Sequence, residues 1–352
     1  MTSSQIPDAH SNSAGKGRSL LARLARFASV IAVSAALAGC VNATLDDLGG
    51  QAPEIPKKLV GEMSKKKMAP SSPVLVRIFK QESELEIWKQ DSRGRYALLK
   101  TYPMCRWSGK LGPKTKIGDR QAPEGFYHVS AGMLNPKSQF YLSFNLGYPN
   151  RLESALGYTG EALMVHGACS SSGCYAMTDQ GVSEIYAVAY AALKGGQERF
   201  QVQAYPFRMT PDNMAAHSTD PNYGFWKNLK QGYDIFDVAK RQPKVNSCSG
   251  RYVFDGEFTG GDPTDPLAEC PPLLNSADPM VSAKSSADET KIAQVLAKGS
   301  ASSAYGYVDG GMHPSFRALL ERSGPEKLAT QISKRKYPIS RPDAALADPY
   351  KD

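Results

Sequence analysis

The alternation of apolar and polar residues predicts several short β-strands in the first two thirds of the chain. In the run 84–89, Leu85 and Ile87 alternate with charged residues, which is typical of a strand with one buried face. Similar alternation, or a short apolar run between turn residues, predicts further strands at 73–80, 96–99, 140–146, 162–165 and 200–204. Together they predict a β-rich domain over residues 73–207 with one or two helices.

Two stretches show helical periodicity, and the first, predicted over 183–194, ends at Gly195 and Gly196. Its apolar residues share one face: Ile185, Val188, Ala189 and Ala192. The second carries a mainly aromatic stripe that we interpret as core rather than as a binding site: Phe225, Trp226, Leu229, Tyr233 and Phe236. It predicts a helical extension over 208–274 that packs on the domain. Residues 275–352 are dominated by Ala, Ser, Lys, Asp and Pro with little periodicity, so we expect a low-complexity tail that is disordered or forms loosely attached helices.

Residues 1–40 have the pattern of an export signal. Basic residues precede an apolar run over 27–37, which at about a dozen residues is shorter than a membrane span. The run ends at Cys40 in a sequence that resembles a bacterial lipobox, which implies cleavage before Cys40 and lipid on its sulfur; a plain signal peptide is the alternative. Because no Asp follows Cys40, resemblance to Gram-negative lipoproteins implies a periplasmic protein anchored in the outer membrane. Residues 41–72, rich in Pro, Gly, Lys and Ser, are expected to form a tether.

The charge of the chain suggests an acidic surface as its surroundings. The 352 residues have a formal net charge of +8, with much of the excess in the leader and in the lysine-rich stretch 57–67. No recognisable nucleic-acid-binding module accompanies this charge, so we expect no nucleic acid as partner. A cell-wall or membrane surface fits the composition better.

The run from His166 to Asp179 holds the candidate chemistry. It contains three serines, two glycines and two cysteines, and it follows the apolar strand predicted at 162–165. Such a run predicts a tight loop, with the next helix starting near an N-cap at Asp179 or Ser183. A strand, a Gly-rich turn and a helix in this order expose a nucleophile and leave backbone N–H groups to bind an oxyanion.

We assign Cys174 as the nucleophile and His166 as the base that takes its proton, because an ordinary thiol is mostly protonated at neutral pH. Ser172, Gly173 and Tyr175 are assigned to oxyanion binding or to orienting the loop. Gly173 lets the backbone approach a substrate closely.

Other readings of the same residues remain open. His128 is the rival base, on a strand of unknown facing. The serines at 170–172 are poorer nucleophiles, because nothing like a Gly-x-Ser-x-Gly elbow surrounds them. A zinc site built from His166, Cys169 and Cys174 would lack a clear fourth ligand, so no metal is expected.

The His166-Gly167 pair followed by Ser172-Gly173-Cys174 resembles the signature of the L,D-transpeptidase (YkuD-like) family. The compact spacing and the run Gly-Cys-Tyr-Ala-Met-Thr-Asp resemble its YafK branch, although Ser172 replaces the usual second histidine and Ala176 stands where Arg or Asn is common. A basic loop before Pro-Glu-Gly at 123–125, and the runs 145–150 and 226–234, extend the resemblance over roughly 73–255: Lys110, Leu111, Gly112, Pro113 and Lys114 form that loop.

The resemblance implies a fold that is mainly β with α, an L,D-transpeptidase β-sandwich catalytic domain plus a helical C-terminal extension. It implies that the Cys174 thiolate attacks the L-centre carbonyl of meso-diaminopimelate in a peptidoglycan stem peptide, without a cofactor. The acyl group then passes to an amine, which is transpeptidation, or to water. The alternatives are an amidase that releases a peptidoglycan-linked outer-membrane protein, and a catalytically idle peptidoglycan-binding lipoprotein.

Arg106, Lys114 and His128 are candidates for substrate binding, with a solvated surface role as the alternative for the two cations. If Cys40 is lipidated and Cys174 stays free, four cysteines remain, and export favours disulfides between them. Four cysteines allow three connectivities. We favour Cys248 with Cys270 and Cys105 with Cys169, whereas a Cys169–Cys174 bond would silence the enzyme.

Overall fold

Two five-stranded sheets form the centre of the computed structural model, which describes residues 52–299, 305–334 and 337–347. The first sheet has the order β3 (Tyr96–Pro103), β2 (Glu84–Gln90), β1 (Val74–Phe79), β10 (Arg199–Tyr205) and β5 (Gly125–Ser130). Only its β1–β10 pair is parallel. β1 is buried along its whole length, which explains its nearly continuous apolar sequence.

The second sheet has shorter strands and holds the candidate chemistry. Its order is β4 (Arg106–Trp107), β9 (Tyr175–Ala176), β8 (Met164–His166), β7 (Ser143–Asn145) and β6 (Leu134–Asn135). β8 and β9 are parallel neighbours, so the chain leaves β8 at His166 and returns beside it directly after Cys174.

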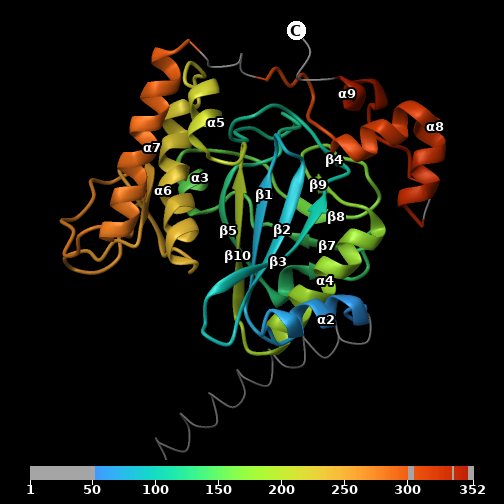
Figure 1. The fold of residues 1–352 in the computed structure, drawn as a ribbon, viewed down its shortest axis with the longest axis horizontal. Coiled ribbons are helices and arrows are strands. Elements are labelled where there is room, and N and C mark those ends of the chain that lie inside the picture. Colours follow the sequence, from blue (N-terminus) through green and yellow to red (C-terminus); the bar gives the residue numbers. More distant parts are fainter. Residues whose placement is uncertain (1–51, 300–304, 335–336, 348–352) are drawn as a thin grey trace, which may run out of the picture. The chain divides into compact units, whose positions relative to one another are not determined.

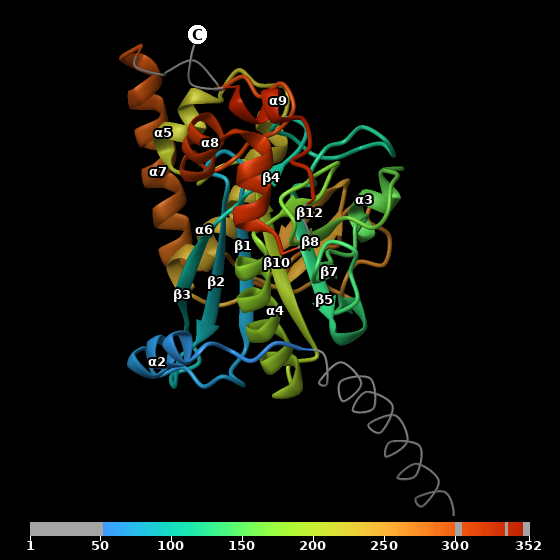
Figure 2. The ribbon, with the colours of Figure 1, turned by 90° about the vertical axis from the view of Figure 1, so that its right-hand side faces the viewer.

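Helix α4 (Asp179–Lys194) packs against strands of both sheets, as Figure 2 shows. The face predicted to be apolar is buried in full: Ile185, Val188, Ala189 and Ala192. The N-cap expected at Asp179 or Ser183 is Thr178 instead, because its backbone is extended and its hydroxyl accepts the Gly181 N–H at 2.9 Å. The capping residue Thr178 thus lies near the end of the run from His166 to Asp179.

The mainly aromatic stripe lies on α6 (Tyr223–Ala239), and its prediction as core is confirmed. Trp226, Leu229 and Phe236 have no exposed surface, and α6 packs on the first sheet through Phe79 and Tyr205. Figure 1 draws α5 (Pro211–Ala216) and α7 (Pro279–Ala297) beside α6. Helix α6 also contacts β12 (Arg251–Phe254), which pairs with β11 (Val245–Cys248), and Leu152 of α3 (Arg151–Ala155) belongs to the same apolar cluster. The mixed β and α architecture with a helical C-terminal part is confirmed.

Over 275–352, the helical alternative and not disorder is what the structure shows for the residues that it describes. They form α7, α8 (Pro314–Ile332) and α9 (Pro342–Leu346). Apolar residues of this part pack around the Cys105–Cys169 disulfide: Met312, Phe316, Leu320, Leu328, Ile332, Ile339 and Ala345. Their periodicity is weak because α8 is kinked at Gly324, where φ is 75°, so this stretch is not one regular helix.

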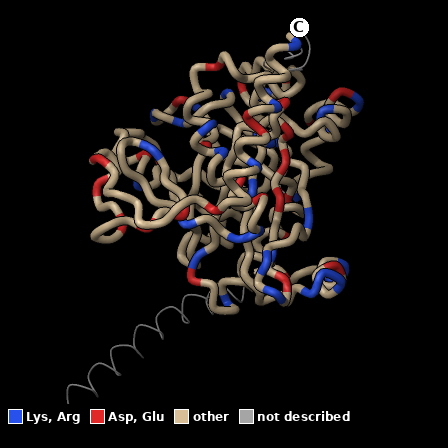
Figure 3. Tube along the Cα trace, turned by 60° about the vertical axis from the view of Figure 1, so that its left-hand side comes forward, with Lys and Arg blue, Asp and Glu red and all other residues tan. Residues whose placement is uncertain are grey.

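The tether expected over 41–72 is also partly packed. Helix α2 (Lys57–Lys65) buries Leu59 and Met63, and the Lys66 ammonium donates to the Leu99 carbonyl of β3 at 3.1 Å. The predicted export signal, Cys40 and the start of the tether lie outside the described residues. In the described part, no helix is long and apolar enough to cross a membrane. In the view of Figure 3, basic and acidic residues are intermixed along the elements drawn.

A buried ion pair holds the basic loop against the first sheet. Lys80 and Glu124 lie 2.8 Å apart with fully buried side chains. The Trp226 indole donates to the other Glu124 oxygen at 2.9 Å, and the Gly112 N–H donates to the first at 2.7 Å. Lys80 also donates to the carbonyls of Gly112 and Ala122. The Glu124 carboxylate and the Lys80 ammonium therefore hold the main chain at Gly112 and at Ala122, on either side of Lys114.

We expect Glu124→Gln to lower the free energy of unfolding by about 3–5 kcal/mol, because it leaves the Lys80 ammonium buried without its counter-charge. Urea unfolding followed by circular dichroism measures this change. The double variant Lys80→Met/Glu124→Gln should regain part of the loss, whereas Glu62→Gln, in the exposed pair with Lys65 on α2, should have no effect. An unchanged urea midpoint in Glu124→Gln would show that the pair is not a stability determinant.

Candidate active site

The pairing of β8 with β9 brings the Cys174 thiol beside the strand that ends at His166. His166 is opposite Ala176 and Val165 is opposite Tyr175, so the next step of the ladder sets Met164 opposite Cys174. The Met164 N–H approaches the Cys174 sulfur at 3.4 Å. Alternate residues of a strand share a face and neighbouring strands lie about 4.8 Å apart, so Cys174 lies diagonally across from His166, which is two residues further along β8.

The imidazole of His166 is held in one tautomer. It is 3% exposed, and its Nδ1 lies 2.6 Å from the Gly167 carbonyl oxygen, which can only accept a hydrogen bond. Nδ1 therefore carries the proton and Nε2 keeps a lone pair. The Phe140 ring lies 4.7 Å from the imidazole, centroid to centroid. Burial lowers the pKa of His166 to about 4, against a raising effect of the bond to Gly167, so the ring is neutral at pH 7.

The Cys174 thiol is partly exposed and is the free cysteine of the described residues. Burial raises its pKa, while the hydrogen bond from the Met164 N–H and the charge of Lys114 act in the opposite direction. Its sulfur also lies 3.8 Å from the Ala162 carbonyl oxygen. A neutral thiol beside a neutral base means that the proton leaves the sulfur as the sulfur attacks, rather than before substrate binds.

The loop between the two side chains is shaped by one glycine and one serine. Gly173 has a φ of 123°, a conformation that residues with side chains rarely adopt. Ser172 has an exposed side chain, whereas the buried Ser171 hydroxyl donates to the Cys174 carbonyl at 2.7 Å and lies 3.0 Å from the Ser108 hydroxyl. Ser171 is thus the serine that orients the loop. The sequence gives no signal that distinguishes Ser171 from its neighbours Ser170 and Ser172.

Comparison with known proteins decides the family. The chain is 46% identical over 182 residues to the "Putative L,D-transpeptidase YafK" of Escherichia coli (strain K12), which covers 52% of this chain and 74% of that protein. The chain belongs to the YafK-like L,D-transpeptidase family. The same identity and coverage hold for the protein of that name from Escherichia coli O157:H7. No protein-family model matches the chain.

Two solved structures show a more distant likeness. One is the helical cell shape determining protein Pgp2 from Campylobacter jejuni, at 17% identity, with 53% of this chain and 80% of that chain covered and a TM-score of 0.31. The other is Bd1075 from Bdellovibrio bacteriovorus, at 16% identity, with 49% and 76% covered and a TM-score of 0.29.

The structure does not support Arg106 as a residue that binds substrate. Its side chain is completely buried, and its guanidinium donates to main-chain carbonyls of Trp107, Asp309, Gly311 and Ser340. Burial lowers its pKa to about 10. Arg106 therefore organises the C-terminal segment instead of contacting solvent or substrate.

His128 and Lys114 have different outcomes. His128 lies on β5 in the first sheet and lines a cavity of about 130 Å³ with Asn246 and Tyr252, so the structure does not bring it to Cys174. The Lys114 ammonium is buried, donates to the Lys116 carbonyl at 2.7 Å and pairs with Asp119. Its charge nevertheless reaches Cys174 and favours the thiolate. Tyr175 is buried and its hydroxyl donates to the Pro123 carbonyl, a structural contact.

Both disulfides expected from the sequence are present in the structure. Cys105 joins Cys169 and Cys248 joins Cys270, which leaves Cys174 reduced. The zinc alternative loses Cys169 as a ligand, and the described residues contain no group of three or more His, Cys, Asp or Glu that could hold a metal. Cys169 and the residue before it, Ala168, have φ values of 49° and 68°, so the disulfide anchors a strained turn next to His166.

We expect Lys114→Met to raise the pKa of Cys174, because it removes the nearby positive charge that favours the thiolate. The pH dependence of Cys174 alkylation by iodoacetamide measures this pKa, and its midpoint should move to higher pH. Lys110→Met, which removes an exposed charge from the same loop, is the matched control and should leave the midpoint in place. Equal midpoints in the wild type and Lys114→Met would mean that Lys114 does not act on the thiol.

Proposed function

We propose that this protein is a cysteine acyl-transfer enzyme that acts on meso-diaminopimelate stem peptides of peptidoglycan. The observation that supports the proposal best is a free Cys174 thiol beside Met164 of β8, the strand that ends at His166, with the Gly167 carbonyl fixing the tautomer of the imidazole. Membership of a family whose relative is named "Putative L,D-transpeptidase YafK" supports acyl transfer as the reaction class. The substrate class is the one that the sequence resemblance implies.

In the first half-reaction, the Cys174 sulfur attacks the L-centre carbonyl of the stem peptide, and Nε2 of His166 takes the thiol proton. The carbonyl oxygen becomes an oxyanion near the backbone of the Gly173 turn. The tetrahedral intermediate collapses, His166 returns its proton to the leaving amine, and a thioester remains on Cys174. Two bonds change: a carbon–sulfur bond forms and a carbon–nitrogen bond breaks.

In the second half-reaction, an acceptor attacks the thioester and gives its proton to His166, which then protonates the departing sulfur. An amine acceptor completes a transpeptidation, and water completes a hydrolysis. The same residues serve both outcomes, so amidase activity toward peptidoglycan-linked protein is the second candidate. A free thiol and a histidine held in one tautomer favour an enzyme, because a peptidoglycan-binding lipoprotein without activity would need neither group.

The proposed location is the periplasm, with a lipid on Cys40 holding the protein at the outer membrane. The support is the leader pattern, together with two disulfides, which persist in oxidising compartments. Mass spectrometry of the mature N-terminus tests the lipid: an unmodified Cys40, or cleavage at another position, would contradict it.

The products identify the reaction. The chain without residues 1–40 is incubated with sacculi that carry attached protein and with purified tetrapeptide muropeptides, and mass spectrometry follows the products. Cross-linked dimers or amine exchange indicate transpeptidation, and released protein with intact tripeptides indicates an amidase. The absence of any product that depends on Cys174 would contradict an acyl-transfer enzyme and favour the binding alternative.

A further inference from the structure

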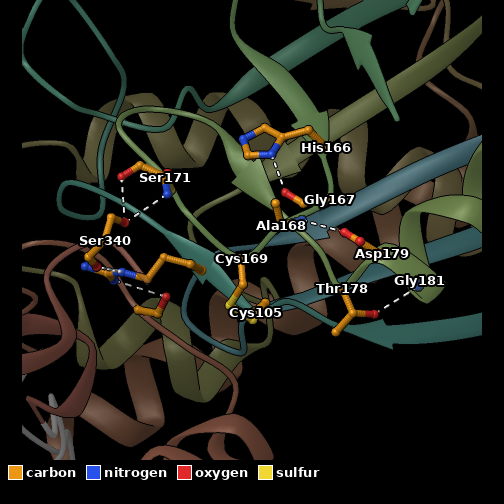
Figure 4. Close-up of a disulfide and its surroundings, with 12 residues drawn as sticks. Cys105, His166, Gly167, Ala168, Cys169, Ser171, Thr178, Asp179, Gly181 and Ser340 are labelled. Atoms are coloured by element: carbon orange, nitrogen blue, oxygen red, sulfur yellow. Dashed lines mark hydrogen bonds between the residues drawn. A yellow bond between two sulfur atoms is a disulfide. The ribbon is translucent and has the colours of Figure 1, made fainter. Parts of the chain in front are cut away.

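The C-terminal segment, residues 305–334 and 337–347, contacts the loop between His166 and Cys174 (the catalytic loop) through one serine. The Ser171 N–H donates to the Ser340 hydroxyl at 2.9 Å, and the Ser340 hydroxyl donates to the Ser171 carbonyl at 3.0 Å, as Figure 4 shows. One side chain thereby satisfies both main-chain groups of a loop residue 169 positions earlier in the sequence. The backbone of Ser340 is itself held by Arg106.

The held residue is next to the nucleophile. The Ser171 hydroxyl donates to the Cys174 carbonyl at 2.7 Å, and the Gly173 N–H approaches the same hydroxyl at 3.4 Å. The contacts therefore run without a break from Ser340 through the main chain and side chain of Ser171 to the peptide group of Cys174. Loss of the first link would free the main chain of Ser171 and let its hydroxyl turn away.

A second contact fixes the other end of the loop to the same segment. Asp179 accepts the Ala168 N–H at 2.9 Å with one oxygen and the Lys334 N–H at 2.6 Å with the other. Ala168 and Cys169 are both left-handed, which costs about 1–3 kcal/mol for each residue and requires the surroundings to hold them. The disulfide from Cys169 is covered by apolar residues of α8 and α9. Contacts with the C-terminal segment thus restrain the loop directly at Ser171 and, through Asp179, at Ala168.

We propose that Ser340 is a positioning residue for the reaction: it holds the main chain of Ser171, so that the Ser171 hydroxyl fixes the Cys174 peptide group and keeps the thiol in place beside β8. The proposal rests on the proposed acyl-transfer function of Cys174. It makes the C-terminal segment a part of the active site, although this segment contributes no group to the chemistry.

The test compares Ser340→Ala with Ser340→Thr in the full chain. Ser340→Ala should lower kcat for acyl transfer about tenfold and leave KM unchanged, because a loosened nucleophile binds substrate but reaches the attack geometry less often. Ser340→Thr keeps the hydroxyl and should restore kcat. Thr330→Ala removes a hydroxyl from α8 that bonds only the Lys327 carbonyl, and this matched control should retain full kcat.

A second measurement needs no substrate. Mass spectrometry of the Cys174 peptide follows its alkylation by iodoacetamide as a function of pH. In Ser340→Ala the less confined thiol should titrate at lower pH, closer to an ordinary cysteine, since burial is what raises its pKa. In a Ser171→Ala background, Ser340→Ala should have no further effect on kcat, because its route to Cys174 is already broken.

These readouts separate the two proposals. If the wild type transfers no acyl group, the proposed function fails, and the alkylation profiles still decide whether Ser340 positions the thiol. An unchanged alkylation profile together with unchanged kcat in Ser340→Ala overturns the positioning role. A loss of kcat that Ser340→Thr does not restore, or that Thr330→Ala matches, overturns it as well, since either result indicates general destabilisation.

Discussion

Cys174→Ala should abolish acyl transfer without disturbing the fold. The sulfur is the atom that would carry the acyl group, and losing the nucleophile of such a site typically costs about 10⁶-fold in kcat. The substitution removes only one weak contact from the Met164 N–H and one to the Ala162 carbonyl. Product formation from tetrapeptide muropeptides, with quantification by mass spectrometry, measures the effect.

The control for this prediction is structural. The thermal midpoint and the near-ultraviolet circular dichroism of Cys174→Ala should match those of the wild type, because Cys174 belongs to neither disulfide. Wild-type turnover in Cys174→Ala would exclude a covalent thioester at this position. Lost turnover together with a collapsed spectrum would show instead that the thiol is a structural group.

The candidate pair could be predicted from the sequence because its information is local. His166 and Cys174 lie within one run of nine residues, between a recognisable strand and a recognisable helix. The strands β1 and β2 could be predicted equally well, because their burial follows directly from continuous or alternating apolar residues. The family resemblance adds the chemistry to this local pattern.

The supports of the pair could not be predicted, because they depend on contacts between distant parts of the chain. Arg106 has the charge of a surface residue, and only the carbonyls of Asp309, Gly311 and Ser340 explain its burial. Ser340 lies in a stretch whose apolar residues follow no single period, owing to the kink at Gly324. The composition of this stretch therefore suggested disorder, although the C-terminal segment packs on the catalytic loop.

His166→Gln should lower kcat/KM by about 10³–10⁴-fold, because the thiol, whose pKa is raised, then has no base to take its proton. Glutamine fills much of the same space against the Phe140 ring, so the fold should survive. His128→Gln is the matched control, since it changes the rival base on the other sheet, and it should keep wild-type kcat/KM. The reverse result, with His128 essential and His166 dispensable, would transfer the base to the first sheet.

The pH profile of the wild type tests the same assignment independently. Burial lowers the pKa of His166 to about 4, so the base becomes protonated only near that pH and not near 6.5, the usual value for histidine. As pH falls from 8 to about 5, kcat/KM should therefore stay level, and it should decline as pH falls through about 4. An acid limb near 6.5 would mean that an exposed histidine performs the proton transfer. The position of that limb thus tests whether the base is the buried His166.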